Sequence, residues 1–151
     1  MLHEFEQLED AALAALMPMI ASTGVRTIEA YAGQLEVDDL SRITIRFPCI
    51  YVMADGLKNT RSNNIDDCRL SLLLLVGDKN YRNNTAASRG DATTPGVYTI
   101  LKAVRDALHR RKMFANWSPI CLVSEDPQVY EPKKGMCLYT AKYEMQAQRN
   151  L

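Results

Sequence analysis

The sequence predicts a single α+β domain over residues 1–151, with a mostly antiparallel or mixed sheet of about four to five strands and two packed helices. Three observations predict this class. In residues 66–77 the even positions from Cys68 onward form one apolar face with the two-residue period of a β-strand, while the odd positions are polar up to Ser71 and apolar at Leu73 and Leu75. Residues 4–20 and 94–109 have apolar side chains at the three- and four-residue steps of a helix. No obvious linker separates the segments, and the predicted element order is α-β-β-β-α-β-β.

The first predicted element is a helix over residues 4–20, whose apolar stripe consists of Phe5, Leu8, Ala12, Leu16 and Met19. Pro18 is unfavourable inside a helix, so the last turn is expected to kink or end there. Gly24 follows as a break, and Val25–Tyr31 is predicted to be a short strand. Residues 32–46 favour neither a helix nor a strand, and their acidic side chains predict an exposed segment.

The middle of the chain predicts two strands joined by a polar connection. Cys49–Ala54 is expected to be a short buried strand, entered through the extended pair Phe47–Pro48. Residues 55–65 are rich in turn formers and are predicted to be a loop or the tip of a long hairpin. The strand that follows has one continuous apolar face, formed by Cys68, Leu70, Leu72, Leu74 and Val76. We therefore expect this strand near the middle of the sheet, where it contributes to the core.

A second polar loop, at residues 78–93, is predicted to lead into the second helix. Thr94 is expected to be the N-cap of this helix, with Pro95 in its first turn. The apolar stripe of the helix consists of Val97, Ile100, Leu101, Val104 and Leu108. Basic residues at its C-terminal end are favoured there by the helix dipole.

Two strands are predicted after this helix. Trp117–Ser124 is expected to be the first of them, and residues 125–135, which contain two prolines, are predicted to be a turn or an arm. Cys137–Gln146 alternates apolar and polar side chains and is predicted to be a half-exposed final strand.

Composition and charge exclude several function classes. Lys plus Arg and Asp plus Glu both number 18, so no net charge drives the chain onto nucleic acid or a membrane surface. The acidic N-terminus does not match a signal peptide, and no apolar run approaches the length of about 18 residues that a membrane span needs. All four cysteines fall in strand-like segments, which predicts a reduced cytosolic protein with buried thiols.

No residue pattern indicates a metal, a cofactor or a catalytic group. The cysteines lack the spacing of zinc ligands, and the two histidines, His3 and His109, lie near the ends of predicted helices. No nucleophile motif or glycine-rich phosphate loop is present. The acidic pairs Asp38–Asp39, Asp66–Asp67 and Glu125–Asp126 are interpreted as solvated charge, because adjacent side chains of a strand point to opposite faces. We therefore expect a protein without enzymatic activity.

Basic residues in the polar loops and after the second helix form the predicted interaction surface. The loops at 55–65 and 78–93 exceed the usual connection of about 4–6 residues, and long loops on a compact domain commonly make contacts. The helix dipole already explains the cluster after the second helix. The predicted contact residues are Lys58, Arg61, Arg82, Arg89, Arg110, Arg111 and Lys112.

Several segments, in their order along the chain, resemble a known family. They are Ile28–Leu35, Arg46–Val52, Cys68–Val76, Gly96–Arg105 and Leu138–Tyr143, and with the N-terminal helix they span nearly the whole chain. In these segments the sequence resembles the Mu-like bacteriophage and prophage family of small tail-assembly proteins. The motifs, such as Tyr-Ala-Gly-x-Leu and Phe-Pro-x-x-x-Val, are packing and turn signatures with no active site among them.

The resemblance implies a role as a tail terminator or in head–tail completion. Such proteins are α/β domains that form a ring, commonly a hexamer, on the head-proximal end of the tail tube. They stop the growth of tube and sheath and present a face to the neck proteins. The implied partners are further copies of the chain, tail tube and sheath proteins, and neck proteins, while DNA passes through the ring without recognition of its sequence. The implied location is the bacterial host cytoplasm during assembly and then the virion tail.

A ring closes when each copy offers two different complementary surfaces. The final strand, Cys137–Gln146, is expected to supply one of them as an exposed edge of the sheet. The polar loops at residues 55–65 and 78–93 are expected to act as docking arms. Function would then consist of self-association and docking, with no bond made or broken.

Two alternatives remain open. One is a neck adaptor that binds the terminator instead of forming it; gene position directly before sheath and tube genes would help to separate these two roles. The other is a small cytosolic enzyme, whose site would need Asp55, Asp78 and Glu125 to converge around Tyr51 or Tyr81. Alanine substitutions there that abolish a measured turnover would favour the enzyme.

Overall fold

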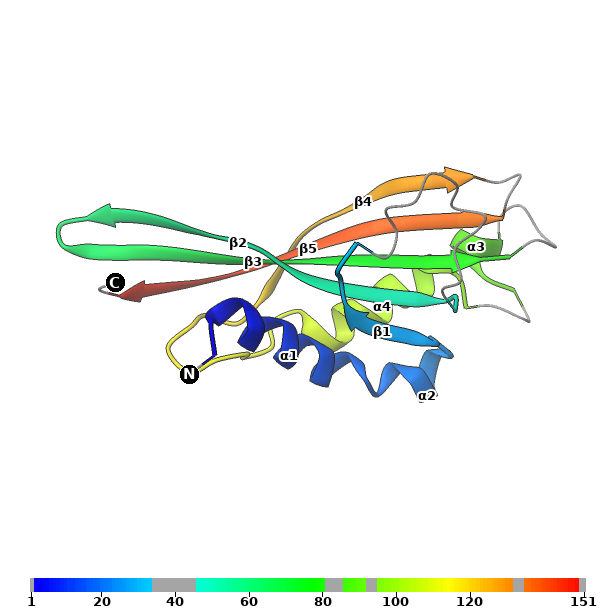
Figure 1. Cartoon of the computed structure of the whole chain (residues 1–151), viewed down its shortest axis with the longest axis horizontal. Helices are drawn as coiled ribbons and strands as arrows, with labels where there is room; N and C mark the ends of the chain where they lie inside the picture. Colours follow the sequence, from blue (N-terminus) through cyan, green and yellow to red (C-terminus); the bar gives the residue numbers. More distant parts are fainter. Residues whose placement is uncertain (1, 34–45, 81–85, 92–94, 132–134, 150–151) are drawn as a thin grey trace.

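The computed structural model describes residues 2–33, 46–80, 86–91, 95–131 and 135–149. Within them, five strands form one sheet in the order β1-β2-β3-β5-β4 (Figure 1). The strands are β1 Thr27–Ala30, β2 Cys49–Ser62, β3 Ile65–Lys79, β4 Cys121–Glu131 and β5 Met136–Arg149. β1 runs parallel to β2 and all other neighbours are antiparallel, so the sheet is mixed, as predicted.

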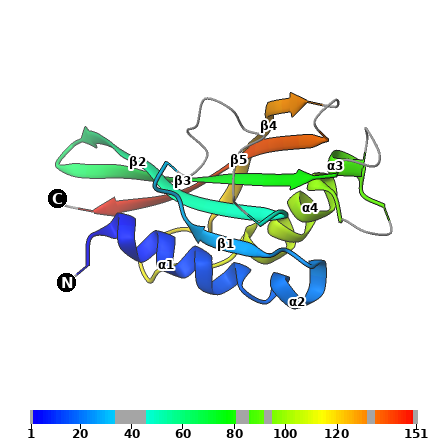
Figure 2. The ribbon, with the colours of Figure 1, turned by 45° about the vertical axis from the view of Figure 1, so that its right-hand side comes forward.

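Two long helices pack against one face of this sheet. α1 (Glu4–Leu16) contacts β2 and α4 (Val97–Leu108), and α4 contacts β3 and β5. Figures 1 and 2 show both helices on the same side of the sheet. A short helix, α2 (Met19–Thr23), follows α1 after the break expected at Pro18, and another, α3 (Ala86–Arg89), precedes α4. This arrangement confirms the predicted α+β class with two packed helices.

The core lies between these two helices and the sheet face made by alternate residues of β3. On β3 the fully buried side chains are Cys68, Leu70, Leu72, Leu74 and Val76. The helices contribute the buried side chains of Leu8, Ala12, Leu16, Ile100, Val104 and Leu108. β3 lies between β2 and β5 in the sheet. The apolar alternation therefore predicted both the buried face of this strand and its central position.

The stretch at residues 55–65 is not a loop but the outer part of a long hairpin. β2 continues to Ser62 and β3 begins at Ile65, which leaves only Asn63 and Asn64 in the turn. Both asparagines have left-handed backbone conformations, with φ of 49° and 65°, as two-residue hairpin turns require. The loop prediction is wrong because polar side chains are stable in a strand that meets solvent; the alternative of a long hairpin tip is correct.

We call residues 55–71 the hairpin arm. The arm begins at a bulge, where the pairing of β2 with β3 shifts by one residue between Ala54 and Gly56. β5 runs beside β3 almost to the end of the arm, with Arg149 opposite Asp66. Figure 1 shows the hairpin turn projecting beyond the helices, at the end of the molecule opposite α3.

α4 begins later than predicted. Its N-cap is Gly96, with a φ of 81°, so Pro95 precedes the helix instead of forming its first turn. The predicted N-cap, Thr94, lies outside the described residues. The side chain of Asp78, 18 residues earlier in the sequence, contacts the start of the helix instead. Its carboxylate accepts a hydrogen bond of 2.9 Å from the Gly96 N–H. α3 and the last residues of β3 occupy part of the loop predicted at 78–93.

β4 differs from its prediction at both ends. It begins at Cys121 instead of Trp117 and continues to Glu131, through the stretch predicted to be a turn. Pro127 is tolerated because β4 is the outermost strand, where a missing N–H does not interrupt a ladder on both sides. Two bulges interrupt the pairing of β4 with β5, one of them directly after Pro127.

β5 is an interior strand, so the prediction that Cys137–Gln146 forms an exposed sheet edge is wrong. It pairs with β3 on one side and with β4 on the other. Alternation in sequence shows which face of a strand is buried, but it does not show which strands lie beside it. The undefined segment at residues 32–46 lies almost entirely outside the described residues.

Candidate interaction surface

The outer edge of the hairpin arm has no strand beside it among the described residues. β1 pairs with β2 only from Cys49 to Val52, and next to this pairing the Tyr31 N–H donates to the Val52 carbonyl at 2.8 Å. Every side chain from Lys58 to Ser62 is exposed. An open strand edge is a template for pairing with another chain unless charge or a bulge protects it. The arm therefore offers an extended surface for contacts outside the domain.

The arm has three basic and three acidic side chains, and two of the basic ones face each other. Lys58 stands directly opposite Arg69 in the β2–β3 register, and like charges in that relation destabilise a sheet. The Nε atom of Arg69 lies 3.8 Å from a carboxylate oxygen of Glu144, which offsets part of the repulsion. Arg61 stands opposite the buried Asp66. The sequence predicted Lys58 and Arg61 as contact residues. It did not predict Arg69, because Arg69 lies in the strand that was predicted to contribute to the core.

The arm tip, residues 61–65, combines positive charge with an apolar side chain. Arg61 and Ser62 are exposed, and the Ile65 side chain is 49% exposed. The turn itself requires only residues that adopt a positive φ, a condition that its two asparagines fulfil. An exposed isoleucine at the end of a projecting hairpin is thus not explained by the turn, and it suits a contact with another molecule.

A groove of about 640 Å³ lies between the start of α1, residues 114–117 and the end of β5. We call it the N-terminal groove. Its apolar lining consists of Leu2, Phe114, Ala115, Trp117 and Ala147. Its polar lining consists of Glu4, Gln7, Asn116 and Gln148. α1, which forms one wall, has four acidic and no basic side chains, namely Glu4, Glu6, Glu9 and Asp10. The groove therefore has a mixed apolar and polar lining and lies beside an acidic helix.

The structure does not bring the seven predicted contact residues into one patch. Lys58 and Arg61 share the arm, whereas Arg89 is exposed at the end of α3, at the opposite end of the molecule (Figure 1). Arg82 lies outside the described residues. Of the predicted contact residues, Lys58 and Arg61 are therefore the two that lie on the arm.

Arg110, Arg111 and Lys112 are exposed directly after α4. The Arg110 N–H donates to the Ile120 carbonyl at 2.6 Å, and the Ile120 N–H donates to the Arg111 carbonyl at 2.9 Å. These bonds hold the basic cluster against the segment that leads into β4. The backbone of Arg110 and Arg111 therefore follows the end of α4 and is hydrogen-bonded to Ile120, just before β4.

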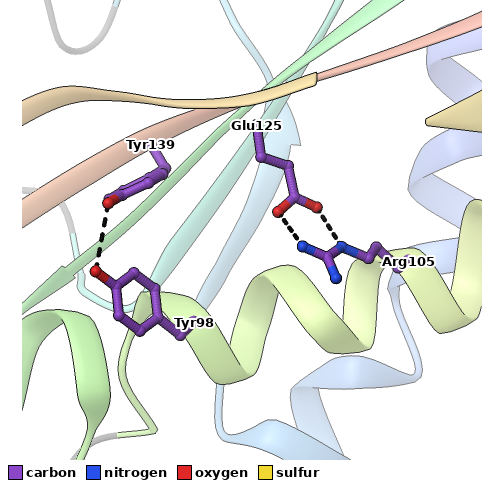
Figure 3. Close-up of polar contacts among 4 residues, drawn as sticks. All are labelled: Tyr98, Arg105, Glu125 and Tyr139. Carbon is purple, nitrogen blue, oxygen red and sulfur yellow. Dashed lines mark hydrogen bonds and ion pairs between the residues drawn. The ribbon is translucent and has the colours of Figure 1, made fainter. Parts of the chain in front are cut away.

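Polar side chains tie α4 to the strands β4 and β5 (Figure 3). The Nε and Nη2 atoms of Arg105 each donate a hydrogen bond of 2.5 Å to one of the two carboxylate oxygens of Glu125. The hydroxyl oxygens of Tyr98 and Tyr139 lie 3.4 Å apart, with the two rings edge to face. The sequence contained no signal for these pairs, because their members are 20 and 41 residues apart.

The carboxylates that the enzyme alternative requires do not converge. Asp55 lies at the bulge of β2 beside Leu72 of β3, and Asp78 is six residues further along β3, which corresponds to about 20 Å. Asp55 lies 3.9 Å from the Nζ atom of Lys142, and Glu125 is held by α4. Each carboxylate therefore has its own separate surroundings.

Asp78 acts as a structural carboxylate. It is fully buried, and its two oxygens accept hydrogen bonds from the Lys79 and Gly96 N–H groups at 2.7 and 2.9 Å. Burial raises the pKa of Asp78 to about 6, although both hydrogen bonds favour the ionised form. Burial also raises the pKa of Tyr51 to about 12, and Tyr81 lies outside the described residues.

In the described part of the chain, no group of three or more His, Cys, Asp or Glu side chains could hold a metal ion. Cys49, Cys68 and Cys137 are buried free thiols, as predicted, but Cys121 at the start of β4 is exposed. None of the helices in the described ranges is long and apolar enough to cross a membrane.

A similar fold occurs in a solved structure of a virion. A solved structure described as "Virion of native gene transfer agent (GTA) particle" contains a similar chain. The two chains are 12% identical, the match covers 94% of this chain and 95% of that one, and the TM-score is 0.55. At this identity the likeness concerns the fold. The class defined here is thus an α+β domain with a projecting arm, whose fold is shared with a chain of a virion.

Comparison with curated proteins gives no match. A family model described as "Bacteriophage Mu, Gp37" matches residues 4–146. The chain therefore belongs to the Bacteriophage Mu Gp37 family. This confirms the resemblance to Mu-like phage proteins that the sequence segments indicated.

Proposed function

We propose that this chain is a non-enzymatic structural protein of a Mu-like phage particle and acts as its tail terminator. In this role, copies of the chain form a ring at the head-proximal end of the tail tube, end the growth of tube and sheath, and join the tail to the neck. Membership of the Mu Gp37 family supports a phage role, and the fold shared with a chain of a virion particle supports a structural one.

The hairpin arm is the observation on which self-assembly rests. It projects from the domain and exposes one strand edge. It also places Lys58 opposite Arg69, and like charges in that relation destabilise a sheet. A closed ring needs two different complementary surfaces on each copy. The arm and the N-terminal groove are two such surfaces. The separated positions of Asp55, Asp78 and Glu125 support the absence of enzymatic activity.

The remaining partners follow from the proposed position. The ring, commonly a hexamer in proteins of this kind, contacts tail tube and sheath proteins on one side and neck proteins on the other. DNA passes through it without sequence-specific contacts, in keeping with equal numbers of acidic and basic residues. Assembly takes place in the host cytoplasm, and the finished ring belongs to the virion tail.

Growth of tail tubes tests this role directly. Purified tube protein of the same phage is polymerised with and without the chain, and tube lengths and ends are measured by electron microscopy. We expect shorter tubes that bear a ring at one end. Unchanged lengths together with bare ends would contradict the terminator role. If the chain instead bound a ring formed by another protein and left tube length unchanged, it would be a neck adaptor.

A further inference from the structure

We propose that the arm tip of one copy docks into the N-terminal groove of a second copy. This inference rests on the proposed function and names the two surfaces that meet between neighbours in the ring. The tip supplies Ile65 and Arg61, and the groove supplies its apolar lining and the acidic side of α1.

Apolar surface on the tip matches apolar surface in the groove. Ile65 is 49% exposed and Leu2, in the groove lining, is 54% exposed. Phe114 and Trp117 extend the apolar lining beside Leu2. Since burial of apolar surface is favourable, both exposed side chains gain from a contact with each other. Exposed apolar side chains within a polar surround are typical of interaction sites.

The tip does not fill the groove of its own copy. The pairing of β2 with β3 is unbroken from Gly56 to the turn, with Ser62 opposite Ile65. This pairing keeps the arm extended, so its tip cannot fold back. Ile65 lines a small pocket together with Gln148, which also borders the groove, so the tip lies next to the groove of its own copy without entering it. We therefore assign a second chain as the occupant of the groove.

The charge at the arm tip is opposite in sign to that of α1. Within residues 61–65 Arg61 is the charged side chain, whereas the arm as a whole has three acidic and three basic residues and no net charge. α1 has four acidic residues and no basic one, and Glu4 lines the groove itself. Opposite charges of this kind guide two surfaces together and fix their register.

The proposed contact is heterologous because it runs one way: each tip enters the groove of the next copy and receives no tip from that copy. A reciprocal exchange of tips between two copies would be isologous and would stop at a dimer. Repetition of a heterologous contact produces a closed ring if the rotation between neighbours closes. A contact between two identical arm edges would be isologous and would stop at a dimer. The tip-and-groove contact is therefore the one that agrees with a ring.

Matched substitutions of two exposed isoleucines test the contact. The mass of the full-length chain in solution is measured by light scattering after size-exclusion chromatography. We expect wild-type protein to form a multimer and Ile65→Asp to lose it. Ile20→Asp is the control, because Ile20 on α2 is 42% exposed and lies outside both surfaces. Circular dichroism of both variants verifies that they are folded.

Reversal of charge provides a second test that does not depend on the apolar contact. Arg61→Glu is expected to reduce the multimer fraction, and so is Glu4→Arg. The double variant restores opposite charges across the contact and is expected to recover the multimer. Lys102→Glu, an exposed change on α4, is the control and should have no effect.

Cross-linking identifies which surfaces meet. Two preparations with Cys121→Ser, one with Ile65→Cys and the other with Leu2→Cys, are mixed under a mild oxidant. We expect a disulfide-linked pair of the two variants, which does not form when Ile20→Cys replaces Ile65→Cys.

The possible outcomes separate this inference from the proposed function. A multimer that survives Ile65→Asp, or a mixed pair that does not form, would overturn the tip-and-groove contact and leave the ring intact. If Ile65→Asp lost tube binding but kept the multimer, the tip would contact the tube protein instead of a second copy. This result would overturn the tip-and-groove contact as well. A wild-type chain that is monomeric in solution and absent from tube ends would overturn the proposed function itself.

Discussion

Arg105 on α4 and Glu125 on β4 form an ion pair with two hydrogen bonds between side chains 20 residues apart. The Arg105 side chain is 50% exposed and that of Glu125 only 11%. β4 is an edge strand whose pairing with β5 is interrupted twice. The ion pair therefore gives this strand a second attachment, from the helix layer to the sheet edge.

Arg105→Ala is expected to lower the free energy of unfolding by about 0.5–1 kcal/mol, because a half-exposed ion pair is screened by water and salt. Urea denaturation measures the change. Arg105→Lys, the control, keeps the charge but loses the two-pronged geometry, so it should recover only part of the loss. A loss above about 3 kcal/mol would show that the pair is effectively buried.

Tyr143→Phe is expected to leave the free energy of unfolding unchanged or to raise it by up to about 1 kcal/mol. Tyr143 is fully buried, and its hydroxyl has no hydrogen-bond partner within the described residues. Burial also raises its pKa, in keeping with a desolvated hydroxyl. Removal of an unsatisfied buried polar group relieves a desolvation cost.

Thermal and urea unfolding measure the effect of this substitution. Tyr139→Phe is the matched control, because the Tyr139 hydroxyl lies 3.4 Å from that of Tyr98, and we expect it to give no gain. A clear destabilisation by Tyr143→Phe would mean that the hydroxyl is satisfied.

Asp78 is expected to make stability depend on pH. Its pKa rises from 3.8 to about 6 on folding, mainly through burial, so the folded chain binds this proton more tightly than the unfolded chain. The contribution of Asp78 to stability is therefore largest below about pH 4 and falls as pH rises to about 6, by up to about 3 kcal/mol. Above that pH it is constant.

Urea denaturation at a series of pH values checks this expectation. Asp78→Asn has no titrating carboxyl at this position. The free energy of wild type minus that of the variant should therefore decrease between about pH 4 and pH 6. A difference that is constant with pH, or that increases with it, would contradict the raised pKa.

Gly96→Ala is expected to lower the free energy of unfolding by about 2 kcal/mol or more. A Cβ atom at this position would lie 2.3 Å from the Gly90 nitrogen and 2.7 Å from the Arg89 carbonyl carbon, and the φ of 81° is unfavourable for alanine. Gly24→Ala is the control, since its φ of 78° is similar but no atom lies within 4 Å. Thermal unfolding should show a clearly smaller loss for Gly24→Ala, of about 1–2 kcal/mol; equal losses would contradict the clash.

The candidate site was only partly predictable from the sequence. Lys58 and Arg61 were found because they lie in a polar stretch that was too long for an ordinary connection. The sequence left a loop and the tip of a long hairpin both open for that stretch, because turn-forming residues and polar side chains also occur in a strand exposed to solvent. Ile65 was not predicted as a contact residue, since it is a single apolar residue at the end of that polar stretch.

The sequence by itself determined the α+β class, the buried face of β3 and the apolar stripes of α1 and α4, because periodicity within one element reveals which side avoids water. The segments of the family resemblance are of the same local kind. Only the tertiary structure decided that β5 lies inside the sheet, that β2 extends into an arm, and that Leu2, Trp117 and Ala147 meet in one groove. These features depend on pairing between residues far apart in the chain, and the side chains of a single segment do not determine that pairing.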